Sequence, residues 1–466
     1  MTDKKQNKPS RGTVAERIAH ARRSQWIKFG IVALLYLLFV IWDNNYWLLL
    51  GLLLIFDIYI SKVVNWGAWK QSNNKTLRTI ADWADAIVFA LIAVYFINIF
   101  IFQNYKIPSS SLEKTLLVGD YLFVSKVAYG PRVPNTPLAF PLTHHTLPIF
   151  NTKSYRDWPH WEYKRLKGLR NVERDDIVVF NFPAGDTVAL NAQNADYHAL
   201  VEAYGWQEVN TNKRKYGNIV YRPVDRRENY VKRCVGLPGE NLHIINNKVY
   251  INGEELPFPK RAQLNYFVET AGGNFTEKQF RELEISKEDR RIAKAPGYSN
   301  PVYLLPLTQE AHDKIIERKW GTIIQVEREN PEYAMYYPYG NSYGWTRDNY
   351  GPVWIPKKGE TIVLDKKNIE MYSRCIVNYE GNSLRTNGDK VYLNGNPANS
   401  YTFKYDYYFM MGDNRHNSAD SRSWGFVPED HVVGQPILIW MSADPDRGLF
   451  DGGIRWNRIF RFVKNQ

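Results

Sequence analysis

Three short segments, far apart in the chain, carry residues that could together cleave a peptide bond. They read I-P-S-S-S-L-E-K-T-L at 107–116, Y-V-K-R-C-V-G-L-P-G at 230–239 and G-D-N-R-H-N-S-A-D-S-R at 412–422. A serine hydroxyl needs a proton acceptor before it can attack a carbonyl group, and a lysine accepts that proton only when its charge is suppressed. The segments therefore offer a serine nucleophile, a lysine base and a polar orienting turn, with no need for a histidine.

Each segment also has an ordinary structural interpretation when it is taken alone. Ser110 and Glu113 have the spacing of a helix capping box, and the basic pair at 232–233 is typical of a solvated strand end. The Asp-x-Arg at 420–422 could form an ion pair that stabilises a loop. The Ser-x-x-Lys at 111–114 matches one element of penicillin-binding enzymes, but the Lys-Thr-Gly strand that those enzymes also need is absent from the sequence.

Taken together, the three segments resemble the sequence boxes of bacterial type I signal peptidases. That family usually reads P-S-x-S-M-x-P-T-L, then K-R-x-x-G-x-P-G-D, then G-D-N-x-x-x-S-x-D-S-R, and R-D-D-I-V-V-F-N-F-P at 174–183 also matches it. The order of the boxes agrees, and an apolar N-terminal region precedes them. The resemblance implies a membrane-bound serine endopeptidase, a hydrolase that removes N-terminal signal peptides from exported pre-proteins after small residues of the Ala-x-Ala type.

The resemblance also implies a role for each matching residue. Ser111 matches the nucleophile and Lys232 the general base, while the Ser109 side chain and the Ser111 N–H match the oxyanion hole. Ser418 matches the hydroxyl that positions the lysine. The other supporting positions lie in the third box and are Gly412, Asp420 and Arg422. The last two match an ion pair.

Four positions depart from the family pattern. They are Ser110 for a common Gly, Leu112 for Met, Lys114 for Pro and Glu240 for Asp. Lys114 matters most, because it places a second amine near the nucleophile. We expect Lys114 to be exposed at the surface and Lys232 to be the base.

Three apolar segments in the first hundred residues predict a membrane anchor over 26–103. They cover 26–42, 46–60 and 86–102, each near or just below the length that crosses a bilayer. Tryptophans stand at several of their ends, as in interfacial aromatic belts. A buried core helix is the alternative for any one of them, and Asp57 makes the second segment the weakest of the three.

The flanking charges predict how this anchor is oriented. Residues 1–25 and the 61–82 loop are rich in Lys and Arg, whereas the short loop at 43–45 has no basic residue. Because basic loops stay in the cytoplasm, we expect a basic cytoplasmic N-terminus and three crossings. Everything after residue 103 then lies on the extracytoplasmic (periplasmic) side of the bacterial inner membrane, which makes this a multi-pass membrane protein.

Composition narrows the partners and cofactors. Half of the net charge of +12 lies in residues 1–103, a distribution that indicates membrane topology and not a nucleic-acid surface. The expected partners are signal peptides and membrane lipids, in the neighbourhood of the secretion translocon, with no nucleic acid. The two cysteines, Cys234 and Cys375, have no metal-ligand spacing, so we expect no cofactor and no metal. They are either unpaired buried thiols or one disulfide.

From residue 104 onward the pattern predicts a mainly β fold with a twisted sheet or a barrel-like core. Short apolar runs at 121–127, 176–183 and 436–441 are separated by Gly, Pro and Asn, and helical periodicity occurs only around 276–289 and 308–318. K-V-Y-I-N-G near 250 recurs as K-V-Y-L-N-G near 392, each a strand entering an Asn-Gly turn. We therefore expect two similar β units that flank an insertion. The expected bounds are 104–254 for the first part of the catalytic core with excursions at 131–171 and 184–223, 255–360 for the inserted region, and 361–466 for the second part.

Two other functions are compatible with parts of this pattern. One is a different Ser/Lys protease, such as a self-cleaving repressor-like protein, which the membrane anchor and the third box disfavour. The other is a catalytically silent membrane-tethered scaffold that uses 255–360 as its binding surface. The intact set of Ser111, Lys232 and Ser418 disfavours the scaffold.

Overall fold

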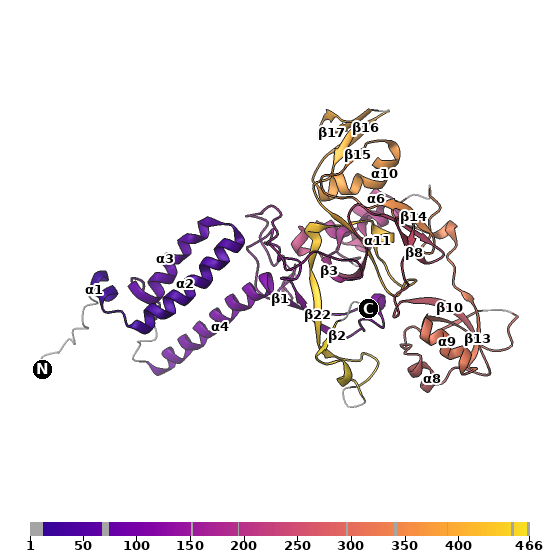
Figure 1. The fold of residues 1–466 in the computed structure, drawn as a ribbon, viewed down its shortest axis with the longest axis horizontal. Coiled ribbons are helices and arrows are strands. Elements are labelled where there is room, and N and C mark those ends of the chain that lie inside the picture. Colours follow the sequence, from indigo (N-terminus) through magenta and orange to yellow (C-terminus); the bar gives the residue numbers. More distant parts are fainter. Residues whose placement is uncertain are drawn as a thin grey trace. The chain divides into compact units, whose positions relative to one another are not determined.

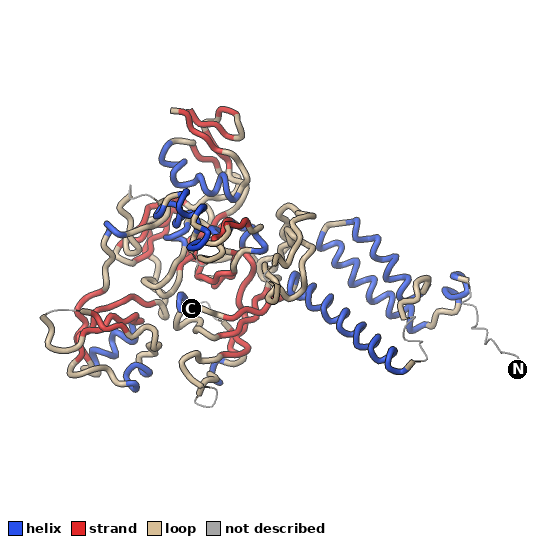
Figure 2. Tube along the Cα trace, turned by 180° about the vertical axis from the view of Figure 1, so that it is seen from behind, coloured by secondary structure: helices blue, strands red, loops and turns tan. Residues whose placement is uncertain are grey.

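The computed structural model describes residues 13–67, 74–150, 152–193, 195–294, 297–339, 343–388, 390–448 and 452–463. The chain forms two compact units, Met1–Phe96 and Ile97–Gln466. Helices dominate the first unit and strands the second (Figure 2). Much of the predicted basic N-terminus (1–12) and Lys70 of the basic loop lie outside the described residues.

The first unit contains two helices that are long and apolar enough to cross a membrane, α2 (Arg23–Asp43) and α4 (Lys75–Phe100). The predicted middle segment forms a shorter apolar helix over Tyr46–Ser61, composed of η1 (Tyr46–Leu50), α3 (Gly51–Phe56) and η2 (Asp57–Ser61). A short amphipathic turn, α1 (Val14–Ala19), precedes α2. The predicted third segment, 86–102, extends too far, because the helix ends at Phe100 and a strand begins at 102.

The middle helix runs antiparallel to α2. The Tyr36 hydroxyl donates to the Leu48 carbonyl at 2.7 Å, and the Gln25 amide donates to the Tyr59 carbonyl at 3.4 Å. The middle helix therefore returns to the level at which α2 begins. Asp57 lies near that end, where its carboxylate accepts hydrogen bonds from the backbone N–H groups of residues 63 and 64.

A curled antiparallel sheet forms the centre of the second unit (Figure 1). Its strand order is β1-β2-β22-β3-β6-β20-β21, with β23 (Arg461–Phe462) on β22. The bounds are β1 Phe102–Lys106, β2 Asp120–Ser125, β3 Ile177–Asn181, β6 Asn229–Gly236, β20 Tyr407–Met411, β21 Val427–Pro428 and β22 Val432–Ser442. The prediction of a mainly β fold built on a curled sheet is confirmed.

At β3 both faces of this sheet are buried, which is why β3 is apolar at nearly every position. Ile177 and Val179 face one apolar cluster, and Val178 and Phe180 face another. A strand covered on both sides reads as a continuous apolar run rather than an alternating one. Burial of these apolar side chains stabilises the sheet, in which β6 lies between β3 and β20. Lys232 lies on β6.

Residues 263–326 form a separate sheet with its own core. Strands β10 (Gln263–Thr270), β11 (Arg291–Ala293), β12 (Val302–Thr308) and β13 (Gly321–Val326) pair in the order β11-β12-β10-β13. Helices α8 (Glu277–Glu282) and α9 (Gln309–Glu317) form where helical periodicity predicted them, and both lie beside this sheet (Figure 1). Phe280 of α8 and Ile315 of α9 pack with the strands in one apolar cluster. These residues lie within the predicted insertion, 255–360, and we call residues 263–326 the inserted module after that prediction; that the region is an insertion stays a prediction.

The two Asn-Gly echoes form matching hairpins. β8 (Lys248–Ile251) turns into β9 (Glu254–Glu255), and β17 (Lys390–Leu393) turns into β18 (Asn396–Pro397). All four turn residues have positive φ, as a tight hairpin turn requires: 51° and 90° for Asn252 and Gly253, 52° and 83° for Asn394 and Gly395.

Smaller elements complete the second unit. Both cysteines, Cys234 and Cys375, are buried and unpaired. β14 (Tyr350–Trp354) pairs with β7 (Asn241–Ile245), which pairs with β8 of the first Asn-Gly hairpin. After the inserted module the chain therefore returns to the sheet that contains this hairpin. The other helices and strands are β4 Thr187–Ala189, α5 Tyr197–Tyr204, α6 Trp206–Thr211, α7 Lys213–Tyr216, β5 Ile219–Tyr221, β15 Thr361–Val363, α10 Lys366–Arg374, β16 Leu384–Asn387, β19 Ser400–Thr402 and α11 Ser421–Trp424.

Candidate active site

Ser111 lies in a single 3-10 turn, Ser110–Leu112, between β1 and β2. The capping box that Ser110 and Glu113 could have formed is not present in this turn. Instead Glu113 ends it, with its N–H donating to the Ser110 carbonyl at 2.9 Å. Leu112 and Leu116 are fully buried in the core beneath the sheet, so the turn is fixed from below and Ser111 is itself buried.

Lys232 reaches Ser111 from the middle of β6. Its Nζ lies 2.6 Å from the Ser111 Oγ, and the whole lysine side chain is buried. Burial lowers the pKa of Lys232 from 10.5 to about 8, although the carboxylates of Asp420 and Asp413 oppose part of that effect. A lysine with this pKa is half unprotonated at pH 8, which an exposed lysine is not.

The third box holds the backbone of the serine turn. The N–H of Asn414 donates to the Ser111 carbonyl at 3.0 Å, and its side-chain amide donates to the Ser110 carbonyl at 3.3 Å. Gly412 leaves no room for a side chain, because a Cβ there would lie 2.6 Å from the Ser111 carbonyl oxygen and 2.2 Å from the Ser418 Oγ. The glycine is required by this close approach and not by its backbone angles.

A buried ion pair joins all three boxes, and sequence reasoning missed it. Arg233, which could have been a solvated strand end, is buried and forms a two-pronged pair with Asp413, at 2.8 Å for each prong. Asp413 also accepts a hydrogen bond from the Thr115 hydroxyl at 2.6 Å. Arg233 directly follows the lysine, and Thr115 lies four residues after the serine. The pair therefore fixes the segments that carry Ser111 and Lys232 relative to each other.

Asp420 and Arg422 form a second buried ion pair beside the lysine. Two guanidinium nitrogens of Arg422 lie 2.9 and 2.7 Å from the two carboxylate oxygens of Asp420, which also accepts the Gly412 N–H at 3.1 Å. Burial alone would raise the pKa of Asp420, but the Arg422 guanidinium outweighs it and holds that pKa below its ordinary value. The Asp420 carboxylate is thus a fixed negative charge near the Lys232 amine.

The remaining predicted site residues make fewer contacts. The Ser418 hydroxyl donates to the Ala419 carbonyl at 3.3 Å, and it makes no hydrogen bond to Lys232 within the described part of the chain. Its role in positioning the lysine stays a prediction. Ser109 is exposed and extended just before the turn. Among the described residues, the backbone hydrogen bonds outside helices and strands include none donated by the Ser111 N–H, and its oxyanion-hole role stays a prediction.

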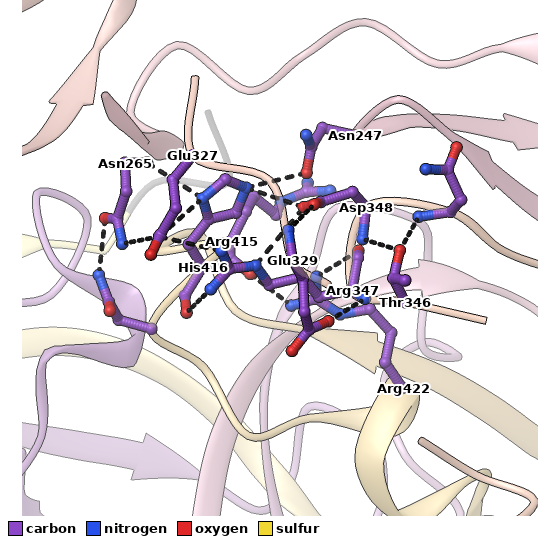
Figure 3. A network of polar contacts seen from close by, with 12 residues as sticks. Asn247, Asn265, Glu327, Glu329, Thr346, Arg347, Asp348, Arg415, His416 and Arg422 are labelled. Carbon is purple, nitrogen blue, oxygen red and sulfur yellow. Dashed lines mark hydrogen bonds and ion pairs between the residues drawn. The ribbon is translucent and has the colours of Figure 1, made fainter. Parts of the chain in front are cut away.

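His416, within the third box, belongs to a polar network that reaches the inserted module (Figure 3). Its Nε2 lies 3.1 Å from Asp348, and its Nδ1 accepts the backbone N–H of Asn265 on β10 at 3.3 Å. The neighbouring His416 imidazole, whose Nδ1 lies 3.8 Å from the Glu327 Oε2, lowers the pKa of Glu327 to about 2. Both ring nitrogens therefore bind the scaffold, and this histidine is not placed to act as the base.

A signal peptidase family model, described as signal peptidase, peptidase S26, matches residues 80–295 and 399–441. These residues are more than half of the chain. The chain belongs to this family. It is accordingly a serine peptidase, and the matched residues include all three boxes.

Individual relatives within the family point the same way. The chain is similar to Signal peptidase I of Buchnera aphidicola subsp. Acyrthosiphon pisum, with 27% identity over 84% of this chain and 83% of the relative. It is similar to Signal peptidase I of Haemophilus influenzae at 23% identity, over 82% of this chain and 76% of the relative. Signal peptidase I of Helicobacter pylori is 22% identical over 84% of this chain and 95% of the relative.

Lys114, where the family pattern has Pro, is not at the surface as we expected. It is buried, with the positive φ of 73°, and its Nζ donates to the Glu284 carbonyl just after α8 of the inserted module. Burial lowers the pKa of Lys114, and the neighbouring Glu113 carboxylate opposes that effect. The Lys114 amine thus binds the inserted module, while the amine of Lys232 contacts the Ser111 hydroxyl.

No group of three or more His, Cys, Asp or Glu side chains that could hold a metal ion occurs in the described ranges.

Proposed function

We propose that the chain is a membrane-bound type I signal peptidase in which Ser111 is the nucleophile and Lys232 the general base. The observation that supports this most strongly is the 2.6 Å contact between the Ser111 Oγ and the Nζ of a fully buried lysine with a lowered pKa. The family membership supplies the reaction class, removal of signal peptides from pre-proteins.

In the proposed mechanism, unprotonated Lys232 takes the proton of the Ser111 hydroxyl as the Oγ attacks the scissile carbonyl carbon. The carbonyl oxygen becomes an oxyanion, which the Ser111 N–H and the Ser109 hydroxyl stabilise. A pre-organised donor of this kind typically contributes about 3–4 kcal/mol. Protonated Lys232 then gives its proton to the leaving amine, and the mature protein departs. Water, deprotonated by Lys232, hydrolyses the acyl-enzyme and releases the signal peptide.

The proposed specificity is for small residues, of the Ala-x-Ala type, before the cut. Ser109 precedes the serine turn in an extended conformation (φ −133°, ψ 157°) and is exposed. An extended backbone next to the nucleophile suits a substrate that binds as an added strand. Such binding takes its affinity from main-chain hydrogen bonds and its specificity from alternate side chains.

The proposed topology has three crossings, with the catalytic unit on the extracytoplasmic side. Among the described residues, two helices are long and apolar enough to cross a membrane, but the shorter Tyr46–Ser61 helix returns to the level at which α2 begins. The Arg17 guanidinium donates to the Lys62 carbonyl at 2.6 Å, which brings the basic flanks of both helices to one end. Signal peptides and membrane lipids are the partners in this proposal, near the secretion translocon.

The test is cleavage of a pre-protein by the full-length protein in proteoliposomes, with the products identified by mass spectrometry. We expect one cut, directly after the second alanine of an Ala-x-Ala site. Replacing that alanine in the pre-protein by leucine should leave no detectable product, because a pocket for a small residue excludes the larger side chain. Equal cleavage of both pre-proteins, or cleavage at another bond, would overturn the proposed specificity.

A further inference from the structure

The peptide group between Ser110 and Ser111 carries the N–H that the proposed mechanism places in the oxyanion hole. In a planar trans peptide, the carbonyl and the N–H point in opposite directions from one rigid group. Whatever holds the Ser110 carbonyl therefore also sets the direction of the Ser111 N–H. The side-chain amide of Asn414, which is fully buried, donates to that carbonyl at 3.3 Å.

A series of side-chain amides connects Asn414 to the inserted module. The Asn417 Nδ2 donates to the Asn414 Oδ1 at 3.0 Å and to the Asn265 Oδ1, on β10, also at 3.0 Å. The Asn265 Nδ2 in turn donates to the Glu327 Oε2 at 2.8 Å, and Glu327 directly follows β13 (Figure 3). We call Asn265, Asn417 and Asn414 the asparagine link.

The two ends of the asparagine link are groups that accept hydrogen bonds and cannot donate them. One end is the Ser110 carbonyl. The other is Glu327, whose pKa is lowered to about 2, mainly by the His416 imidazole and with a smaller contribution from the Arg347 guanidinium. The Glu327 side chain is therefore a carboxylate at neutral pH.

These two acceptors fix the direction of every amide between them. Asn265 turns its NH2 group toward Glu327 and its oxygen toward Asn417. Asn414 turns its NH2 group toward Ser110 and its oxygen toward Asn417. The NH2 group of Asn417 has two hydrogens and donates one in each direction. An aspartate, which when ionised only accepts, does not fit any of the three positions.

The backbone of β10 binds the same part of the third box. The Gln263 N–H donates to the Asp413 carbonyl at 2.9 Å, and the Arg415 N–H donates to the Gln263 carbonyl at 3.0 Å. Gln263, which is fully buried, thus pairs with Asn414 in parallel. Backbone and side-chain contacts from β10 therefore converge on Asn414, the residue that holds the Ser110 carbonyl.

We propose that Asn265 and Asn417 are positioning residues, which act through Asn414 to aim the Ser111 N–H at the oxyanion. This inference rests on the proposed function, because it takes Ser111 as the nucleophile and its N–H as an oxyanion donor. It gives the inserted module a part in the reaction that needs no contact with the substrate. A donor aimed at the oxyanion acts in the transition state, so its loss changes kcat and not KM.

The experiment starts from Asn265→Asp in the full-length protein. This change keeps the shape of the side chain but sets a second carboxylate against Glu327. The double variant Asn265→Asp/Glu327→Gln restores one donor and one acceptor in reversed order, and it keeps an oxygen that accepts from Asn417. Asn417→Asp removes both of the hydrogen bonds that Asn417 donates, at a position that is only partly buried.

The matched control is Asn300→Asp, elsewhere in the inserted module. The Asn300 Nδ2 donates to the Glu269 Oε1 at 3.4 Å, so this change also sets a second carboxylate against a glutamate. Within the described part of the chain, this Asn–Glu pair makes no hydrogen bond to the third box. It therefore reports the cost of the charge change without the asparagine link.

Two quantities are measured for each variant. The first is the pair kcat and KM for cleavage of an Ala-x-Ala precursor. The second is the Ki of a peptide aldehyde that carries the same Ala-x-Ala sequence. In the adduct, the Ser111 Oγ bonds to the aldehyde carbon, the hydroxyl proton passes to Lys232 and the aldehyde oxygen becomes an oxyanion, as in the transition state. Unlike kcat, Ki does not depend on the fraction of the enzyme that is folded.

We expect Asn265→Asp and Asn417→Asp each to lower kcat by about 10–10²-fold and to raise Ki by a similar factor, because a misaligned oxyanion donor loses part of its effect. KM should stay unchanged. The double variant should recover most of both losses, and Asn300→Asp should match wild type. Unchanged kcat and Ki in Asn417→Asp overturn the proposal. So does a fall in kcat with unchanged Ki, which a loss of folded protein would produce, or a double variant no better than Asn265→Asp.

Wild type and Ser111→Ala separate this inference from the proposed function. Failure of wild type to cleave the precursor, or cleavage that persists in Ser111→Ala, removes the proposed function. Cleavage that Ser111→Ala abolishes but that Asn265→Asp and Asn417→Asp leave at the wild-type rate removes the positioning inference alone.

Discussion

Replacing Lys232 by methionine should lower kcat/KM for precursor cleavage by at least about 10⁴-fold, because a serine without its base attacks a peptide bond too slowly to measure. Ser111→Ala should cause a loss of similar size. Since the two side chains act as one unit at 2.6 Å, the double variant should be no worse than either single one. The measurement is cleavage of an Ala-x-Ala precursor by each purified full-length variant, followed by mass spectrometry of the products.

Lys114→Met is the matched control, because it removes the other buried amine near the nucleophile. Loss of the Lys114 amine leaves the Glu284 carbonyl without the hydrogen bond that Lys114 donates to it. The free energy of unfolding should therefore fall by about 1–3 kcal/mol. The serine keeps its own base, so kcat/KM should fall by less than about tenfold, the effect of a small shift in stability or position. If Lys114→Met abolished cleavage and Lys232→Met left it intact, the assignment of the base would be wrong.

Gly412→Ala should lower kcat/KM by about 10²-fold while leaving the fold intact, since a displacement of about 1 Å at a reacting group has that effect. The added Cβ would lie 2.6 Å from the Ser111 carbonyl oxygen, so the serine turn or the third box must move. The Ser418 hydroxyl, 2.2 Å from that Cβ, can rotate away, but the Ser418 Cβ, at 2.6 Å, and the backbone oxygen cannot. The loss should therefore appear mainly in kcat.

Gly272→Ala is the control for this change. Gly272 has no heavy atom within 4 Å of the position that a Cβ would take, and it has no positive φ. The Gly272→Ala variant should retain full activity. Thermal unfolding of both variants separates a displaced site from a destabilised protein. Wild-type kcat for Gly412→Ala would contradict the close approach of the third box to the serine turn.

The three boxes could be located from the sequence because each combines residue types that seldom occur together. A lysine in an apolar strand, such as Lys232, is costly to bury and therefore noticeable. Asn-Gly pairs at 252–253 and 394–395 predicted their turns, since only residues that tolerate positive φ suit them. Helical periodicity located α8 and α9, because the spacing of apolar residues is likewise read from neighbouring positions in the sequence.

What the sequence could not predict depends on contacts between distant segments. Lys114 is polar and was expected at the surface, but the inserted module covers it, and nothing local to residue 114 signals that cover. Arg233 resembled a solvated strand end because its partner, Asp413, lies 180 residues away. The end of α4 was placed two residues too late, since Phe102 is apolar in a strand as well as in a helix.

Glu113 is a second group near the nucleophile that titrates close to neutral pH. Burial raises the pKa of Glu113 to about 7, and the nearby Lys114 amine opposes part of that effect. Glu113→Gln removes this titration with little change of shape. It is therefore the variant in which the titration of Lys232 can be followed without that of Glu113.

The pH dependence of kcat/KM, in wild type and in Glu113→Gln, tests the Ser/Lys dyad most directly. Unprotonated Lys232 is the active form, so activity should be low in acid, rise about tenfold per pH unit and level off above a midpoint near pH 8. The midpoint should stay near 8 in Glu113→Gln. A midpoint near 10.4, as for an ordinary lysine, or near 6.5, as for a histidine, would contradict the account.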